Sequence, residues 1–185
     1  MVIYLSKGIH FQNQSDYIMI NRGMRNATLS GIYSYLWSIG SRRFAKTSDE
    51  REIEALNVLK QMGLIEVKEV EGDNDKYELL THCILSLSDK DITMDDKGIE
   101  HDIYLWLKNA SLNLSIAELV KLHELNVRPS DEWFGRDNLY KLVMKLYEPI
   151  SSDRLLEYQM LNSESKDEVI AAVERLINVG IIEMM

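Results

Sequence analysis

An acidic run near the middle of the chain has the ligand spacing of a calcium-binding EF-hand loop. Oxygen-bearing side chains occupy positions 1, 3, 5, 7 and 12 of such a loop: Asp89, Asp91, Thr93, Asp95 and Glu100. The loop also needs a glycine at position 6 for its sharp turn, and Met94 stands there instead. The segment before it is strand-like rather than helical. We therefore interpret the run as a solvated acidic loop and expect neither a metal nor another cofactor.

The histidines and the single cysteine do not have the spacing of a catalytic or metal-binding motif. The four histidines are His10, His82, His101 and His123, and none belongs to an H-E-x-x-H or a Cys/His ligand pattern. His82 and Cys83 are neighbours in an expected strand, where successive side chains point to opposite faces. A nucleophilic cysteine needs a positioned base. We therefore expect a protein that is not an enzyme.

Length and composition indicate a folded protein of one large or two small domains. The chain has 185 residues, of which 45% are apolar and 28% are charged. No apolar run approaches the ~18 residues of a membrane span. The first residues lack the basic and long apolar regions of a signal peptide. We expect a cytoplasmic protein that does not associate with membranes.

The net charge of −9 is unevenly distributed along the chain. Residues 1–47 contain one acid, Asp16, and six bases: Lys7, Arg22, Arg25, Arg42, Arg43 and Lys46. Their net charge is +5, whereas residues 48–185 carry −14. Such asymmetry indicates that the N-terminal part meets an anionic partner, either a nucleic acid or an acidic peptide. The alternative is that these bases are solvated surface charges.

The first half of the chain mixes strand and helix signals. Alternating apolar residues and polar turns predict strands over 2–5, 9–11, 17–20 and 24–29. A helix over 32–39 follows, with an apolar stripe of Ile32, Tyr35, Leu36 and Ile39. The capping-box sequence Thr47–Glu50 opens a second helix, which ends at Gly63 and leads into a strand over 64–67. Further strands are predicted over 77–80 and 83–87.

The second half is predicted to be helical. The polar run 88–97 favours a domain boundary, so we expect domains over 1–87 and 88–185. Helical signals cover 103–107, 115–125, 139–147, 153–161 and 166–179, followed by a strand over 181–184. Capping-box sequences open two of these helices, at Ser115–Glu118 and Ser165–Glu168. The predicted fold class is α+β and mostly helical.

Two segments repeat the order capped helix, glycine, strand. When Gly63 is set on Gly180, apolar positions of the two preceding helices coincide, as do the segments that follow. Generic amphipathic helices with glycine caps would also align in this way. We nevertheless favour two winged-helix-like domains, the first with an N-terminal three-stranded antiparallel sheet.

The N-terminal segment resembles the PqqD-like domains, also called recognition elements for ribosomally synthesised and modified peptides (RiPPs). Residues 3–10, 16–22 and 24–29 resemble their three strands, and residues 59–65 resemble the glycine-terminated end of their last helix. The resemblance covers about residues 2–67. The chain departs from the pattern because Ile32 and Gly63 are 31 residues apart and leave no room for a full middle helix, whereas 41 residues separate Leu139 from Gly180.

The resemblance implies a non-catalytic adaptor that binds the leader of a precursor peptide and scaffolds its modifying enzymes. In that family the leader adds a strand beside the third strand and lies against the last helix. The corresponding residues here are Met24, Arg25, Ala27 and Leu29 on the strand, with Glu52, Leu56, Leu59 and Lys60 on the helix. Leu56 and Leu59 also fit a purely structural role in the core. A homodimer is left open.

The alternative function is a winged-helix transcriptional regulator that binds DNA. Arg42, Arg43 and Lys46 would then contact phosphates. The helix that follows them is rich in acids (Asp49, Glu50, Glu52 and Glu54), which phosphates would repel. The sequence therefore favours a peptide over a nucleic acid as the partner.

Overall fold

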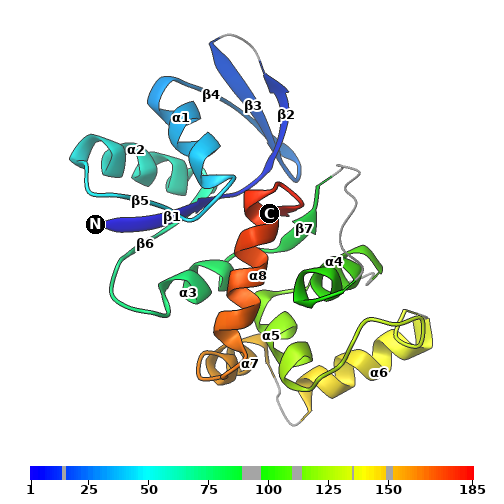
Figure 1. The fold of residues 1–185 in the computed structure, drawn as a ribbon. Coiled ribbons are helices and arrows are strands. Elements are labelled where there is room, and N and C mark those ends of the chain that lie inside the picture. The colour runs from blue at the N-terminus through cyan, green and yellow to red at the C-terminus, as the bar shows by residue number, and fades with distance from the viewer. Residues whose placement is uncertain (14–15, 89–96, 110–113, 135, 149–151) are drawn as a thin grey trace.

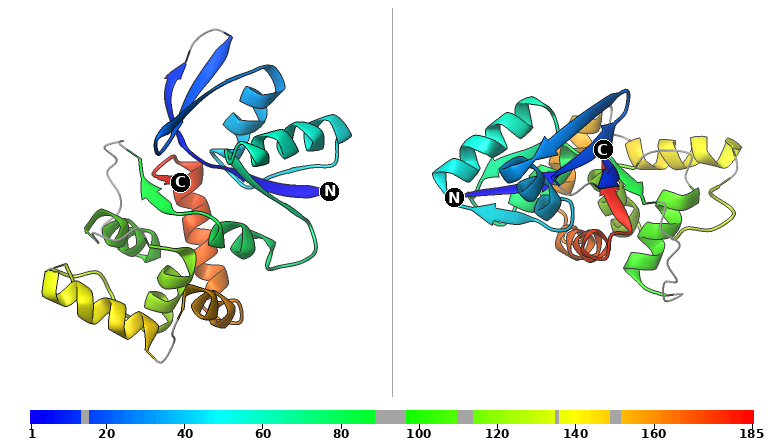
Figure 2. Two further views of the ribbon diagram at one scale, coloured as in Figure 1. Left: turned by 180° about the vertical axis from the view of Figure 1, so that it is seen from behind. Right: turned by 90° about the horizontal axis from the view of Figure 1, so that it is seen from above.

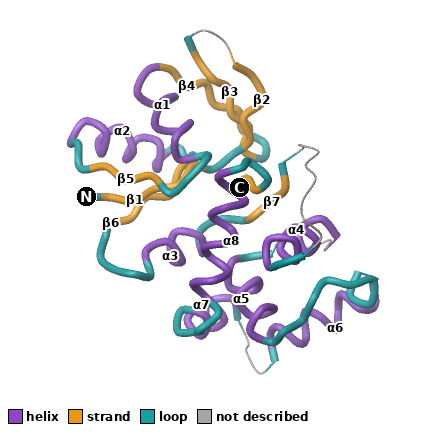
Figure 3. The backbone as a smooth tube through the Cα atoms, in the orientation of Figure 1, coloured by secondary structure: helices purple, strands orange, loops and turns teal. Residues whose placement is uncertain are grey.

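The computed structural model describes all residues except 14–15, 89–96, 110–113, 135 and 149–151 (Figure 1). Its strands are β1 (Val2–Ser6), β2 (Ile9–Asn13), β3 (Tyr17–Arg22), β4 (Arg25–Ser30), β5 (Ala45–Thr47), β6 (Ile65–Glu69), β7 (Leu85–Leu87) and β8 (Ile182–Met184). Its helices are α1 (Gly31–Gly40), α2 (Glu50–Gln61), α3 (Asp75–Thr81), α4 (Ile99–Asn109), α5 (Ile116–Glu124), α6 (Arg136–Tyr147), α7 (Asp153–Met160) and α8 (Lys166–Asn178). The fold is α+β, as predicted, and Figure 3 shows the strands gathered mainly in the upper half and the helices in the lower.

Strand β1 is buried on both faces. It is the middle strand of an antiparallel sheet of order β5-β1-β6, and all five of its residues are buried. Val2 and Tyr4 belong to one hydrophobic cluster, whereas Ile3 and Leu5 belong to another. Because successive side chains of a strand point to opposite faces, one short strand contributes to both cores.

Helices cover the two faces of this sheet. The first cluster, which we call the upper core, is completed by α1 and α2 with side chains such as Leu36, Leu56 and Leu59. The second, the lower core, contains residues of α3, α4, α5, α6, α7 and α8. Figure 2, from behind, shows α8 reaching from α7 to the junction of β1 and β2. Helix α8 packs against α3, α4 and α5 and is therefore the central helix of the lower core.

The chain turns sharply at Gly8 to enter a second sheet, of order β2-β3-β4. Gly8 has a φ of +103°, which side chains rarely adopt. A Cβ there would lie 2.7 Å from Ile20 Cγ2 and 3.0 Å from the Asn21 carbonyl oxygen. The Gly8 N–H also donates to the Met184 carbonyl at 2.7 Å. A glycine is therefore required where the chain passes close to β3 and is tied to the C-terminal strand.

The two glycines that define the sequence repeat end their helices in the same way. Gly63 and Gly180 have φ angles of +73° and +74°. The next N–H, of Leu64 or Ile181, donates to the carbonyl five residues earlier at 2.9 Å in both cases. This is the Schellman pattern of hydrogen bonds that satisfies the last carbonyls of a helix. The cap and the strand after it thus recur in the structure.

The upstream helices of the two copies are placed differently. Helix α1 packs against α2, whereas α6, its counterpart in the alignment, packs against α5. The observed likeness therefore covers the capped helix, its glycine and the following strand. A duplication of the longer unit stays a prediction.

The packing crosses the predicted boundary between residues 87 and 88. Tyr77 and Leu85 lie in the lower core with residues of α4 to α8, as do Ile3, Leu5 and Phe44. Strand β7 pairs with β8 in an antiparallel ladder. That residues 1–87 and 88–185 fold independently stays a prediction. In the structure, α3 and β7 of the first segment pack with the helices of the second.

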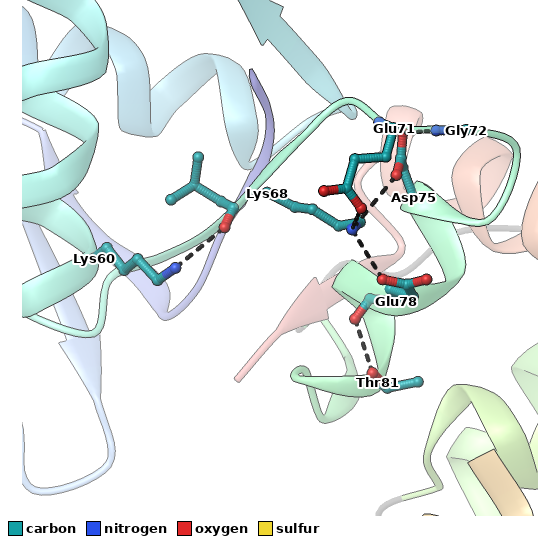
Figure 4. A network of polar contacts seen from close by, with 8 residues as sticks. Lys60, Lys68, Glu71, Gly72, Asp75, Glu78 and Thr81 are labelled. Atoms are coloured by element: carbon teal, nitrogen blue, oxygen red, sulfur yellow. Dashed lines mark hydrogen bonds and ion pairs between the residues drawn. The ribbon is translucent and has the colours of Figure 1, made fainter. Parts of the chain in front are cut away.

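A network of charged side chains fixes the connection between β6 and α3 (Figure 4). The Lys68 ammonium lies 2.9 Å from a Glu71 carboxylate oxygen, 3.0 Å from one of Glu78 and 3.8 Å from one of Asp75. Hydrogen bonds to Glu71 and Glu78 raise the pKa of Lys68. Asp75 also accepts from the N–H groups of Glu71 and Gly72 at 3.0 and 3.1 Å. The turn leading to α3 is therefore held by the Lys68 ammonium and by the two main-chain hydrogen bonds that the Asp75 carboxylate accepts.

Three local predictions were wrong. Residues 77–80 belong to α3 rather than to a strand: buried and half-buried residues alternate over 75–79, as they would in a strand, but Leu79 and Leu80 both lie in the lower core. The cap of α2 is Asp49, which accepts from Arg51 and Glu52, instead of Thr47. On α1, Trp37 is buried in the core and Tyr35 is exposed.

The predicted three-stranded antiparallel N-terminal sheet exists as β2-β3-β4, and only its first strand differs from the stretch that was compared with the family. The stretch compared with the family's first strand, residues 3–10, is divided at Gly8 into β1 and the start of β2. Only β2 joins β3 and β4, with a bulge between His10 and Gln12. The capping box at Ser115 and Glu118 is confirmed, whereas Ser165 makes no side-chain cap.

Replacing Gly8 with alanine should destabilise the protein by about 2–3 kcal/mol, because it adds a steric clash to an unfavourable φ. Gly23→Ala is the matched control, since Gly23 also has a positive φ but a Cβ there would meet no atom within 4 Å. It should lose only about 1 kcal/mol. Urea denaturation of both variants measures the difference. Equal losses would contradict the close packing of Gly8 on β3.

Candidate peptide-binding site

The outer edge of β4 has no strand partner among the residues that the structure describes. Strand β4 lies at one end of the β2-β3-β4 sheet and pairs with β3 from Tyr17↔Ser30 to Arg22↔Arg25. An unpaired edge presents N–H and C=O groups that can bind an extended chain. This is the edge at which the resemblance to PqqD-like domains implies a bound peptide.

The strand residues predicted to bind differ in their exposure. Met24 is fully exposed in the β3–β4 turn, and Arg25 is exposed beside it. Ala27 is half-buried, and Leu29 is buried in the upper core. Only Met24 and Arg25 therefore offer their side chains freely to a ligand.

The main-chain groups that face the free edge come from residues that the sequence reasoning missed. Residues 23 and 24 form a two-residue turn that closes on the pair Arg22 and Arg25. In an antiparallel ladder, hydrogen-bonded and non-hydrogen-bonded pairs alternate, and a two-residue turn closes on a hydrogen-bonded pair. Counting from that turn directs the N–H groups of Asn26 and Thr28 outward. The sequence could have indicated these two residues if the turn had been predicted at Gly23 and Met24, because the position of the turn sets the register of the hairpin.

The helix residues predicted to bind also differ in their exposure. Leu56 and Leu59 are fully buried in the upper core and present no surface to a ligand. Lys60 is exposed and donates to the Val67 carbonyl of β6 at 3.2 Å (Figure 4). Glu52 is half-buried and lines a cavity beside β5. The two leucines support the site from within, as the structural alternative implied.

Two of the six N-terminal bases make internal contacts. The Lys7 ammonium lies 2.8 Å from Glu66 and donates to the His82 carbonyl at 2.8 Å. Arg22 donates to the Gly63 carbonyl at the end of α2. Three of the remaining bases, Arg42, Arg43 and Lys46, are exposed between α1 and the end of β5. Positive charge is therefore concentrated near β5, and only Arg25 adds to it on β4.

The cavity beside β5 has a volume of about 390 Å³. It is lined by residues of β1, α1, the α1–β5 connection, β5 and α2, together with Lys76 of α3 and Glu174 of α8. The polar residues that line it include Tyr4, Tyr35, Arg43 and Glu52. Burial raises the pKa of Tyr4 to about 12, with a further increase from Glu52 and Tyr35 and an opposing effect of Arg43. The Tyr4 hydroxyl is therefore a proton donor at neutral pH.

The other residues considered for chemistry are not assembled into a reactive group. Cys83 is buried after α3, and burial raises the pKa of its thiol to about 12. His10 is exposed on β2, with its ring 6.4 Å from that of Trp37. Among the described residues, no group of three or more His, Cys, Asp or Glu side chains could hold a metal ion. Most of the acidic run that was compared with a calcium loop lies outside the described residues.

No family model matches the sequence, and no match was found among curated proteins or solved structures. Within the described part of the chain, none of the helices has the length and apolar character needed to cross a membrane.

Tyr4→Phe should leave the free energy of unfolding within about 0.5 kcal/mol of wild type, because the Tyr4 hydroxyl bonds to no described residue. Tyr77→Phe is the comparison, since the buried Tyr77 hydroxyl donates to the Glu157 carbonyl at 2.9 Å. That variant should lose about 1 kcal/mol. Chemical denaturation of both proteins tests this, and an equal loss in Tyr4→Phe would show that its hydroxyl has a structural partner.

Proposed function

We propose that this protein is a non-catalytic adaptor that binds the leader of a ribosomally synthesised precursor peptide and brings it to the modifying enzymes. The observation that carries the proposal is the free outer edge of β4 in a sheet whose strands follow the PqqD-like order along the chain. In this proposal the N-terminal elements form a winged-helix-like peptide-binding domain.

Binding by strand addition requires an edge that is both accessible and rigid. Asn26 and Thr28 are exposed, so their outward main-chain groups are accessible. Leu29 lies in the upper core with Leu56 and Leu59, so that strand β4 and helix α2 share one packed interior. A bound strand gains affinity from main-chain hydrogen bonds, and nearby side chains select its sequence. Met24 and Arg25 at the turn, together with Lys60 on α2, are the exposed side chains available for that selection.

The charge of α2 argues against DNA as the ligand. Its first turn carries Glu50 and Glu52, and Asp49 is its cap. Phosphates would be repelled from this end of the helix, although Arg42, Arg43 and Lys46 precede it. A peptide bound through main-chain hydrogen bonds does not have to approach these carboxylates.

Thr28→Pro should weaken peptide binding by about tenfold or more, because proline removes an outward N–H donor. Proline is tolerated on an edge strand when its missing N–H faces solvent, so the sheet should remain folded. Thr28→Val keeps the N–H and should bind like wild type. The probe is a fluorescein-labelled peptide from the N-terminal part of a short open reading frame that neighbours this gene, and binding is followed by fluorescence polarisation.

A random DNA duplex at two salt concentrations serves as the competing ligand in the same assay. Saturable peptide binding that is lost in Thr28→Pro, with circular dichroism unchanged, supports the proposal. Unchanged affinity in a folded Thr28→Pro variant would exclude the β4 edge. Steeply salt-dependent duplex binding without peptide binding would favour the regulator instead.

A further inference from the structure

The cavity beside β5 contains a buried phenol whose hydroxyl is not used by the fold. Tyr4 is only 2% exposed, yet among the described residues its hydroxyl has no hydrogen-bond partner. The other buried tyrosine, Tyr77, bonds to the Glu157 carbonyl, and the partly buried Tyr147 bonds to Glu118 and Asp153. Among the described residues, the fully buried side-chain polar atom without a partner is His101 Nδ1, so the Tyr4 hydroxyl is accessible from the cavity that Tyr4 lines. The Tyr4 hydroxyl is therefore available to bond to a ligand there.

The charges around the cavity leave a single net positive charge. Lys76 is paired with Glu174 at 2.6 Å and lies over the Phe44 ring. Among the described residues, no carboxylate lies within ion-pair distance of Arg43 or Lys46. Likewise, no described base lies within ion-pair distance of Glu52. Two unpaired cations and one unpaired carboxylate thus face the same space.

This balance selects the type of anion. A phosphate with two negative charges would meet both Glu52 and Glu174, whereas a carboxylate carries one charge and fits a guanidinium well. The apolar part of the lining comes from Leu36, Ile39 and Phe44, which suits an aliphatic chain behind the carboxylate. Glu52 can accept only, so it favours a ligand that also carries an N–H group.

We propose that the cavity between α1, β5 and α2 binds an aliphatic carboxylate that also bears an amide N–H, with Arg43 and Tyr4 holding the carboxylate and Glu52 accepting from the N–H. An acidic residue within a peptide has this chemistry, and so has a small free carboxylate with an amide. The site is separate from the β4 edge and does not depend on the function proposed for that edge.

Two probes distinguish the sources of such a carboxylate. N-acetylglutamate N-methylamide represents an acidic residue within a peptide, and butyrate represents a free small carboxylate of one negative charge without an N–H. Two-dimensional NMR titration of the whole chain should show saturable shifts at residues 43–46 with both probes, and tighter binding of the amide. Glu52→Gln should change the ratio of the two affinities by reducing the advantage of the amide. Equal affinities in wild type would overturn the role of Glu52.

Arg43→Gln should weaken binding of the blocked glutamate by about tenfold or more, because it removes the charged donor. Arg42→Gln is the matched control, since Arg42 is the neighbouring exposed arginine and lines a different cavity. Tyr4→Phe should also weaken binding, without loss of stability. The proposal would be overturned if Arg43→Gln and Tyr4→Phe both bound with wild-type affinity. It would also be overturned if neither probe gave saturable shifts. Thr28→Pro should leave this binding unchanged, so failure here is distinguishable from failure at β4.

Discussion

The burial of β1 between two cores is the constraint on which the rest of the structure depends. Its residues alternate between the upper core, with Val2 and Tyr4, and the lower core, with Ile3 and Leu5. A shift of register by one residue would send every one of these side chains to the wrong core. Pairing with β5 on one side and β6 on the other fixes that register. The arrangement of α1 and α2 above the sheet and of α3 below it follows from this one strand.

The end of β1 ties the candidate peptide-binding sheet to the C-terminal helices. Lys7 bonds to Glu66 of β6 and to the His82 carbonyl after α3, and the Gly8 N–H bonds to Met184 of β8. The chain then continues directly into the β2-β3-β4 sheet. The edge of β4 is therefore carried on a sheet anchored at its base to both cores, which gives a bound strand a rigid template. Its affinity need not be reduced by ordering of that template.

The accuracy of the sequence predictions depended on how local the deciding interactions are. The caps at Gly63, Gly180 and Ser115 are formed by residues close in sequence, and their signals were sufficient. The capping-box sequences at Thr47 and Ser165 are just as local but do not form side-chain caps, so a short motif alone does not decide a cap. Residues 77–80 were misread because a short apolar run is compatible with a strand or a helix, and the choice depends on distant contacts. The Tyr77 hydroxyl bonds to Glu157, which is 80 residues away. At the site, the spacing of Leu56 and Leu59 indicated a core role that the structure bears out, whereas their assignment to a bound peptide came from the family resemblance alone.

The charge pattern of the sequence did not show where an anionic partner would bind. The structure does so by separating the bases engaged within the fold from the exposed ones. The sequence assigns +5 to residues 1–47, but Lys7 and Arg22 are engaged within the fold. Arg43 and Lys46 instead face the cavity beside β5, where the Tyr4 hydroxyl also lies. The two proposals therefore assign main-chain recognition to the β4 edge and charge recognition to the cavity. In the strand-addition proposal, a chain bound at β4 needs no particular charge, because its affinity comes from main-chain hydrogen bonds. The anionic partner that the charge of residues 1–47 predicts is therefore better matched by the cavity, which the exposed bases Arg43 and Lys46 line.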